Sequence, residues 1–221
     1  AGLILTELLI MNRDLRTRTA CAVAGRGMLF LVQQTMEEPP RGALTFDDGP
    51  GSSTDRLLDE LQKRNVRATF FVVGEKVEEY PDTLRRMKEE GHIIGNHTYS
   101  HIQLTGVSCE SAIEEVQKNS RVIEEITGER PLFLRPPYGE CTKKMKEQLD
   151  MFVVLWDVDP LDWSVQNTDL VTERVLKQVK ENDIILLHDI FDTSVDAAVR
   201  IVDALQQEQY EFVTVDELLF P

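Results

Sequence analysis

Cysteine is scarce in this chain. Only three cysteines occur among 221 residues, at positions 21, 109 and 141. Their spacings match no zinc-ribbon or Cys-x-x-Cys pattern. An odd and low number also argues against a framework of disulfide bonds. The sequence therefore predicts neither a cysteine-bound structural zinc nor a disulfide-stapled scaffold.

Long hydrophobic runs and an excess of basic charge are also missing. No stretch approaches the roughly 18 apolar residues that suggest a transmembrane helix. Residues 1–10 are apolar but lack a basic leader and a clean cleavage site, so no signal peptide is visible. Lys and Arg number 24 against 39 Asp and Glu, a net charge of −15. Nucleic-acid binding is therefore not expected, because contact with phosphates needs a basic surface.

The chain has the size and composition of one folded α/β domain. Its 221 residues are 42% apolar, which suits a single α/β domain or barrel better than two domains. Residues 1–41 differ from the rest, carry several arginines and end in a Pro-Pro linker signal. We predict that residues 1–41 form a lead-in segment, with a short strand or helix within 27–36, and that residues 42–221 form the main domain.

Strand and helix patterns alternate through the main domain. Strands are expected at 43–46, 68–73, 92–95, 132–134, 152–156, 184–187 and 212–214. Helices are expected at 52–65, 81–90, 108–127, 142–149, 168–180 and 195–207. Such alternation is typical of parallel βα units, and about seven units predict a closed or nearly closed barrel. A doubly wound open sheet is the alternative.

Every unusual polar cluster directly follows a predicted strand. The clusters are Asp47-Asp48, His97 to His101, Arg135 to Gly139, Asp157 to Trp163 and His188-Asp189. The carboxyl ends of parallel strands meet at one edge of a sheet or at one mouth of a barrel. We therefore expect these side chains to converge in one functional site.

A metal ion would explain the two adjacent carboxylates. Asp47 and Asp48 repel each other, and a bound cation offsets such repulsion. His97 and His101 lie four residues apart, so on a helical turn they would share one face. Together with Asp48 they supply two imidazoles and one carboxylate, a set that suits a catalytic Zn²⁺. An acidic turn and surface histidines are the alternative interpretation.

Proton transfer needs a base and an acid beside such a metal. Asp47, left free by its neighbour, is the candidate general base, and Arg135 is a candidate to hold it ionised. His188 ends an apolar strand, where a buried structural histidine is the usual explanation. It is nevertheless the one unassigned histidine at a strand end, and therefore the candidate acid.

Two further residues near the fifth predicted strand have alternative interpretations. Asp162 is a candidate to orient and charge the imidazole of His188. Nearby competitors for that role are Asp157, Asp159 and Asp189. Trp163 either stacks on a sugar ring or belongs to the core.

Five sequence runs carry a resemblance to a known family. They are Thr45-Phe46-Asp47-Asp48-Gly49-Pro50, His97-Thr98-Tyr99-Ser100-His101, Arg135-Pro136-Pro137-Tyr138-Gly139, Asp162-Trp163 and Leu186-Leu187-His188. In this order they resemble the five motifs of the polysaccharide deacetylase family, the NodB-homology domain of carbohydrate esterase family four. The resemblance spans roughly Arg41 to Leu219. It implies a distorted, incomplete (β/α) barrel.

The resemblance also implies a role for each matching residue. For proton transfer it implies Asp47 as the base, Arg135 as the partner of Asp47, and His188 as the acid tuned by Asp162. For the metal it implies Asp48, His97 and His101 as ligands. For the substrate it implies the Tyr138 N–H as an oxyanion donor, Trp163 and Leu186 as the wall around the acetyl methyl group, and Pro137 as a further contact.

The resemblance implies metal-dependent removal of acetyl groups from carbohydrate. The expected substrate is an N-acetylglucosamine polymer such as peptidoglycan or chitin, and the expected location is extracellular or in the cell envelope. Zn²⁺ is the expected ion, with Co²⁺, Ni²⁺ or Fe²⁺ as alternatives. Removal of O-acetyl groups from xylan is an alternative within the same chemistry. A catalytically silent carbohydrate-binding or envelope-assembly module is the alternative from another class.

Overall fold

The computed structural model describes residues 20–23, 29–32 and 38–220. The chain divides into two units, Ala1–Pro39 and Pro40–Pro221, two residues before the predicted boundary. In the first unit, β1 (Ala20–Val23) pairs antiparallel with β2 (Leu29–Val32). The predicted strand or helix within 27–36 is a strand at β2, and its other residues lie outside the described ones.

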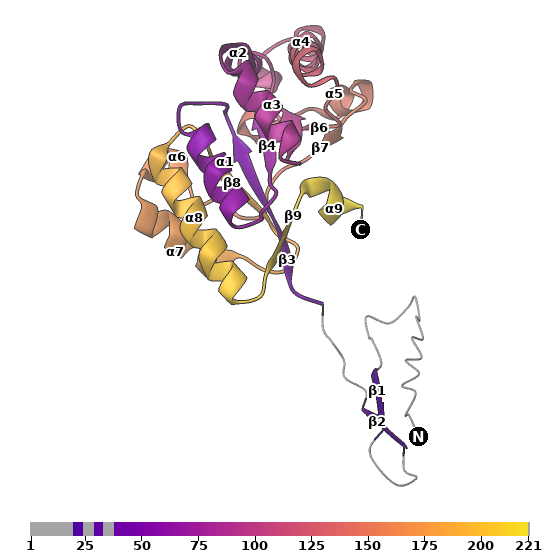
Figure 1. Cartoon of the computed structure of the whole chain (residues 1–221). Coiled ribbons are helices and arrows are strands. Elements are labelled where there is room, and N and C mark those ends of the chain that lie inside the picture. Colours follow the sequence, from indigo (N-terminus) through magenta and orange to yellow (C-terminus); the bar gives the residue numbers. More distant parts are fainter. Residues whose placement is uncertain (1–19, 24–28, 33–37, 221) are drawn as a thin grey trace. The chain divides into compact units, whose positions relative to one another are not determined.

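The second unit is built on a curled parallel sheet (Figure 1). Its strands are β3 (Arg41–Asp47), β4 (Thr69–Val72), β5 (Ile93–Asn96), β6 (Phe133–Leu134), β7 (Phe152–Val153), β8 (Ile184–His188) and β9 (Glu211–Val213). Their order is β7-β6-β5-β4-β3-β8, and β9 also pairs with β3. No pairing joins β7 to β8 among the described residues, so the sheet is the incomplete barrel that the sequence predicts.

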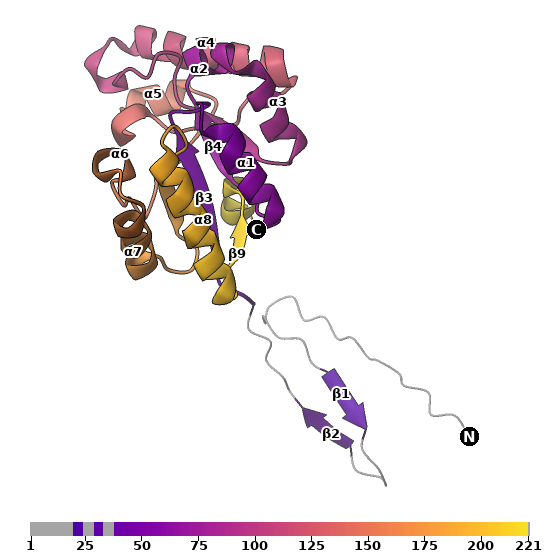
Figure 2. The same cartoon turned by 60° about the vertical axis from the view of Figure 1, so that its left-hand side comes forward.

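Helices follow the strands and cover the outside of the sheet (Figures 1 and 2). They are α1 (Thr54–Lys63), α2 (Gly74–Glu79), α3 (Pro81–Glu89), α4 (Cys109–Thr127), α5 (Lys143–Gln148), α6 (Asp162–Val165), α7 (Thr168–Gln178), α8 (Asp192–Gln207) and α9 (Val215–Leu219), with short 3₁₀ turns η1 (Leu104–Gly106) and η2 (Pro137–Gly139). The sequence did not predict α2, α6 and α9, which are each six residues or shorter.

Two predicted boundaries were wrong for identifiable reasons. β7 stops at Val153 instead of continuing to Trp156, because the guanidinium of Arg135 binds the next two carbonyls, those of Val154 and Leu155. α8 begins at Asp192 and not at residue 195. The Asp192 carboxylate accepts hydrogen bonds from side chains of α1 and its preceding turn, which hold the first turn of α8 in place.

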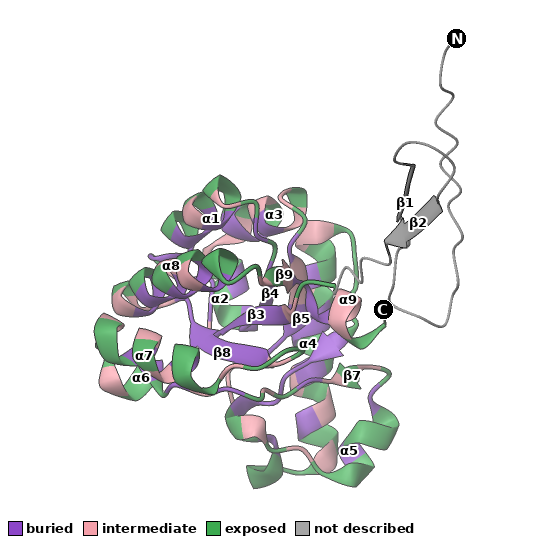
Figure 3. Cartoon of the chain, turned by 90° about the horizontal axis from the view of Figure 1, so that it is seen from below, coloured by how far each residue is buried: buried purple, intermediate pink, exposed green. Residues whose placement is uncertain are grey.

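Side chains alternate between the two faces of the sheet, as strand geometry requires. In β3, Leu44 and Phe46 join the large core between sheet and helices, whereas Ala43 belongs to a smaller core on the opposite face. Thr45 and Asp47 share the face of Ala43, inside the barrel. Figure 3 shows the central strands as buried, with exposed positions confined largely to helices and loops. The barrel interior therefore receives polar side chains from the same strand that builds the core.

No helix in the described part of the chain is both long enough and apolar enough to cross a membrane. The longest, α4, has 19 residues and a polar outer face with several charged side chains.

The register of the sheet places the functional clusters at the same end of their strands. Asp47 lies opposite His188, and Asn96 lies opposite both Val72 and Leu134. The residues that follow these strands therefore leave the sheet at the same end.

Candidate active site and metal centre

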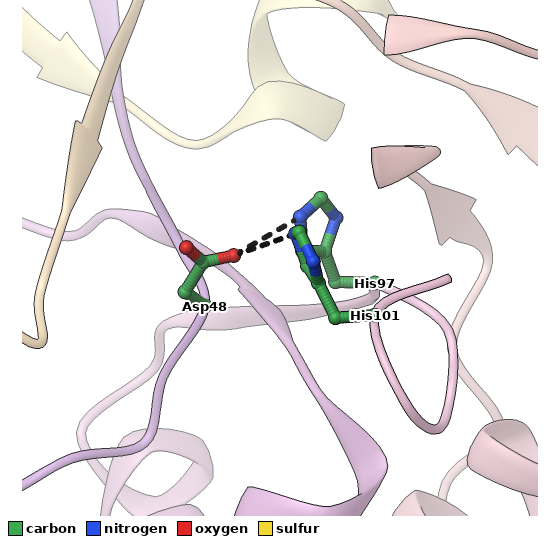
Figure 4. A group of neighbouring side chains, drawn as sticks. All are labelled: Asp48, His97 and His101. Atoms are coloured by element: carbon green, nitrogen blue, oxygen red, sulfur yellow. Dashed lines mark ion pairs between the residues drawn. The ribbon is translucent and has the colours of Figure 1, made fainter. Parts of the chain in front are cut away.

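Three predicted metal ligands meet at the carboxyl end of the sheet. Asp48 follows β3, and His97 and His101 lie in the loop after β5. Asp48 Oδ1 lies 3.1 Å from His101 Nε2 and 3.4 Å from His97 Nε2 (Figure 4). One ligand atom from each of the three residues lies within 4.8 Å of the others. This is the spacing of donors that surround a single ion.

The chemistry of the three side chains fits a divalent cation. The Nδ1 of His97 lies 2.6 Å from the Arg135 carbonyl oxygen and donates its proton there, which leaves the Nε2 lone pair free for a metal. Asp48 Oδ1 is buried without a well-formed hydrogen bond among the described residues. Burial alone would raise the pKa of Asp48, but the imidazoles of His101 and His97 hold it well below its usual range. The carboxyl is therefore an anionic ligand.

The two histidines do not lie on a helical turn, and that part of the prediction was wrong. Residues 97–101 form a loop with no helical hydrogen bonding. Thr98 and His101 both have a positive φ, 64° and 54°. The loop therefore brings His97 and His101 together through left-handed backbone, with their ring centroids 5.0 Å apart.

Asp47 and Arg135 form a buried pair inside the barrel. The guanidinium of Arg135 is fully buried and donates from Nη1 to Asp47 Oδ1 at 2.7 Å. It also donates to Thr45 Oγ1 at 2.8 Å, and it lies 4.1 Å from the ring centroid of Phe71. Arg135 is thus not a surface residue of a Pro-rich turn. Its fixed donors hold the Asp47 carboxylate beside the Asp48 cluster.

His188 and Asp162 form the second buried pair. His188 Nδ1 donates to Asp162 Oδ1 at 2.8 Å, and the backbone N–H of His188 donates to Asp162 Oδ2 at 2.8 Å. Burial opposes a charge on the imidazole, yet the bond to Asp162 and the nearby carboxylates raise the pKa of His188 to about 9. Its Nε2 lies 4.0 Å from Asp48 Oδ2. A protonated nitrogen therefore faces the cluster from β8, the strand next to β3.

The three competitors of Asp162 have other hydrogen-bond partners. Asp157 accepts from the N–H of Ile184, and Asp159 accepts from the N–H of Leu161. Asp189 is fully buried and accepts from Thr54 Oγ1 at 2.5 Å; burial raises its pKa to about 7. The carboxylate that contacts the His188 ring is that of Asp162.

The predicted substrate-contact residues differ in exposure. Tyr138 and Trp163 are more than half exposed, and the Tyr138 ring packs edge-on against His101 at 5.3 Å. Tyr138 also has a positive φ of 61°, within the turn η2. Pro137 and Leu186 are buried. The two aromatic rings are thus available to a ligand, and their proposed contacts remain predictions.

Sequence reasoning missed two residues that support these pairs. Ser194 Oγ donates to Asp162 Oδ2 at 2.6 Å, and Thr45 accepts from Arg135 while donating to the carbonyl of Ile185 at 2.7 Å. Thr45 had a usable signal, because it is the polar residue at an inward position of an apolar strand. Ser194 had no such signal in the sequence, because the helix that contains it was predicted to begin at residue 195.

Comparison with known proteins agrees with this arrangement. The profile described as "Polysaccharide deacetylase" matches residues 35–152. The chain belongs to the polysaccharide deacetylase family. It is 45% identical over 177 residues to peptidoglycan-N-acetylmuramic acid deacetylase PdaC of Bacillus subtilis, covering 80% of this chain and 38% of that protein. It is 41% identical over 179 residues to peptidoglycan-N-acetylglucosamine deacetylase PgdA of Listeria monocytogenes, covering 80% and 38%.

Solved structures of the family share the fold. The structure of PdaC from Bacillus subtilis superimposes with a TM-score of 0.80 at 44% sequence identity, covering 82% of this chain and 90% of that one. The incomplete barrel predicted for this family member is thereby confirmed. The chain spans only 38% of the length of the two curated relatives named above.

Proposed function

We propose that this domain removes acetyl groups from the N-acetylated sugars of a peptidoglycan-like polysaccharide. One observation carries the proposal. The Asp48, His97 and His101 cluster lies between the Asp47 carboxylate, which can accept a proton, and the His188 imidazolium, which can donate one. Hydrolysis of an amide needs these parts together: activation of the carbonyl, a base for water and an acid for the leaving amine.

Asp47 serves as the general base in this proposal. Arg135 neutralises and orients one oxygen of the carboxylate, while Oδ2 lies 3.7 Å from His97 Nε2 and faces the cluster. Asp47 takes a proton from the water that attacks the acetyl carbonyl. Because Arg135 is packed against Phe71 and hydrogen bonded to main-chain carbonyls, Asp47 cannot swing away from that water.

His188 serves as the general acid. Asp162 fixes the proton on Nδ1 and stabilises the imidazolium, so Nε2 carries a second proton toward the cluster. Departure of an amine requires a proton, because an amide anion is a poor leaving group. Ser194 and the His188 backbone N–H keep Asp162 in place for this role.

One divalent cation would be held by Asp48, His97 and His101. Zn²⁺ is the simplest choice for this set of donors, and Co²⁺, Ni²⁺ and Fe²⁺ are the alternatives. When bound, that cation supplies Lewis-acid polarisation of the acetyl carbonyl and of the attacking water. The Tyr138 N–H is the proposed second donor to the developing oxyanion. Tyr138 and the next residue, Gly139, both have left-handed backbone, with φ of 61° and 73°, in the turn after β6.

The substrate class rests on the relatives and on the exposed rings. Both curated relatives named above are peptidoglycan deacetylases by name. We propose that Trp163 and Tyr138 stack on sugar rings, as exposed aromatic side chains commonly do, and that Leu186 and Pro137 border the acetyl methyl group. A substrate of this kind places the protein in the cell envelope or outside the cell.

Acetate release tests the proposed function. The full chain is incubated with peptidoglycan, chitin oligomers and acetylated xylan, each with and without a chelator. We expect chelator-sensitive acetate release from peptidoglycan and a smaller release from chitin oligomers. Release from acetylated xylan alone would identify an O-acetyl esterase. Zn²⁺ binding without acetate release from any of the three would identify a catalytically silent module.

A further inference from the structure

Helix α4 buries two polar side chains in the middle of its inward face. Asn119 and Ser120 are at most 1% exposed, between the apolar residues Val116 and Ile123 of the same face. A buried amide or hydroxyl lowers stability unless it is hydrogen bonded. The partners of these two side chains therefore show why α4 carries them.

Their common partner is Asn96, the last residue of β5. Asn96 is fully buried; its Nδ2 donates to the carbonyl of Val116 at 2.8 Å and to Ser120 Oγ at 2.9 Å. Its Oδ1 accepts from the backbone N–H of Thr98 at 2.7 Å and from Asn119 Nδ2 at 3.2 Å. An amide side chain has two donor protons and two acceptor sites, and all four are used. The Thr98 N–H can only donate, so the amide has one possible orientation.

A second tether joins α4 to the same loop. Glu115 Oε2 accepts from both the backbone N–H and the hydroxyl of Ser100, each at 2.9 Å. Of the two left-handed residues of the loop, Thr98 is itself tethered and His101 directly follows the tethered Ser100. Left-handed backbone is strained in a non-glycine residue and persists only where its surroundings enforce it. The hydrogen bonds from Asn96 and Glu115 supply that enforcement.

We propose that Asn96 is a positioning residue for the candidate metal centre and that α4 is the platform on which it acts. Asn96 works through the Thr98 N–H, which lies in the chain between the ligands His97 and His101. A loop held in advance loses little conformational freedom when its two imidazoles bind an ion, whereas an untethered loop must be ordered at that moment. The inference deepens the proposed function and rests on it.

The test compares Asn96→Ala with a matched loss of a buried hydrogen bond elsewhere. Thr69, at the start of β4, is fully buried and its Oγ1 accepts from the N–H of Val215 at 3.1 Å, so Thr69→Val removes one bond without touching the loop. Zn²⁺ affinity of the full chain is measured by chelator competition, and urea unfolding of the chelator-treated protein is measured in parallel. We expect Asn96→Ala to weaken Zn²⁺ binding by about 10-fold to 100-fold, as outer-shell changes typically do. Thr69→Val should lower stability and leave Zn²⁺ affinity within about twofold of the parent, because it lies outside that shell.

Ser120→Ala provides a second variant that does not depend on the folding of Asn96→Ala. It removes one of the two acceptors of Asn96 Nδ2, and we expect a several-fold loss of Zn²⁺ affinity. Parental affinity in both variants would overturn the inference, as would an equal loss in Thr69→Val, since a general loss of stability would then explain it. A parent chain that binds no Zn²⁺ would contradict the proposed function, and the role of Asn96 with it.

Discussion

The two ends of the parallel sheet each bury a histidine, and the two histidines have opposite proton affinities. His92 precedes β5, and its Nδ1 accepts a hydrogen bond from the Ala68 N–H at 3.0 Å; burial lowers its pKa to about 4. His188 ends β8, and its Nδ1 donates to Asp162, which overcomes burial and raises its pKa to about 9.

Both rings are buried, so the difference lies in whether a partner outweighs the effect of burial on the pKa. Burial lowers the pKa of His92 despite the nearby Glu90, whereas Asp162 outweighs burial at His188. A backbone N–H requires the lone pair of a neutral imidazole, whereas a carboxylate stabilises the imidazolium. At the amino end of the sheet, His92 accepts a hydrogen bond from the backbone as a neutral ring. At the carboxyl end, His188 is the proposed proton donor.

Removal of the base should cause the largest loss. We expect Asp47→Asn to lower kcat for acetate release by a factor of about 10² to 10⁴, because the amide cannot accept the proton of water. The exposed Asp82, which pairs with Arg85 on α3, supplies the control Asp82→Asn, which should retain parental kcat. Near-parental turnover in Asp47→Asn would refute the assignment of the base.

Removal of the Asp162 carboxylate, which is hydrogen bonded to His188, should shift the alkaline limb of the pH profile of kcat. The acid must be protonated, so kcat should fall as the pH rises through about 9, the raised pKa of His188. Asp162→Asn removes the group that raises this pKa, and burial then lowers it, so the limb should move to lower pH. At pH 8 this shift predicts a loss of about tenfold or more. An unchanged limb in the kcat profile would show that His188 is not the titrating acid.

A methyl group at Gly49 should disturb the turn that carries Asp48. A Cβ there would lie 2.3 Å from both carboxylate oxygens of Asp189, which is buried and held by Thr54. We expect Gly49→Ala to lower the free energy of unfolding by about 1–3 kcal/mol and to weaken Zn²⁺ binding. Gly106→Ala is the control, because its nearest contact would be 4.0 Å away. Equal urea midpoints for the two variants would contradict the close packing against Asp189.

Replacement of His92 should have the smallest effect on activity. Its folded pKa lies below the ordinary value, so its stabilising contribution is complete above about pH 6.5 and is lost as the pH falls toward 4. His92→Gln, which keeps an acceptor for the Ala68 N–H, should retain parental kcat. Relative to the parent, it should gain about 1–3 kcal/mol between pH 7 and pH 4.5 in urea unfolding. A parallel pH dependence of the two proteins would exclude this linkage.

Much of the fold could be predicted because strand and helix periods differ along the chain. The bounds of α3 and α4 were predicted to within one residue, since Pro81 opens the first and Ser108 and Gly128 cap the second. The short helices α2, α6 and α9 could not be predicted, because a turn or two of helix leaves no repeated apolar spacing. Their positions depend on tertiary contacts.

The composition of the site was predictable, but its local geometry was not. Asp48, His97 and His101 were placed together because loops after parallel strands share one end of the sheet. The helical turn expected for the histidines was wrong, because the spacing of four residues says nothing about left-handed backbone. The supports of that loop are Asn96 of β5 and the side chains of Glu115, Asn119 and Ser120 of α4, which come from segments that no local pattern connects.

The proposed roles of the two adjacent carboxylates, Asp47 as the base and Asp48 as a metal ligand, are tested most directly by measuring the metal binding of three proteins. The full chain, Asp47→Asn and Asp48→Asn are each titrated with Zn²⁺ against a competing chelator. We expect one equivalent bound by the parent, one equivalent bound by Asp47→Asn, and a loss of affinity of about 10-fold or more in Asp48→Asn. Equal Zn²⁺ affinity in the parent and Asp48→Asn, or loss of binding in Asp47→Asn alone, would contradict these roles.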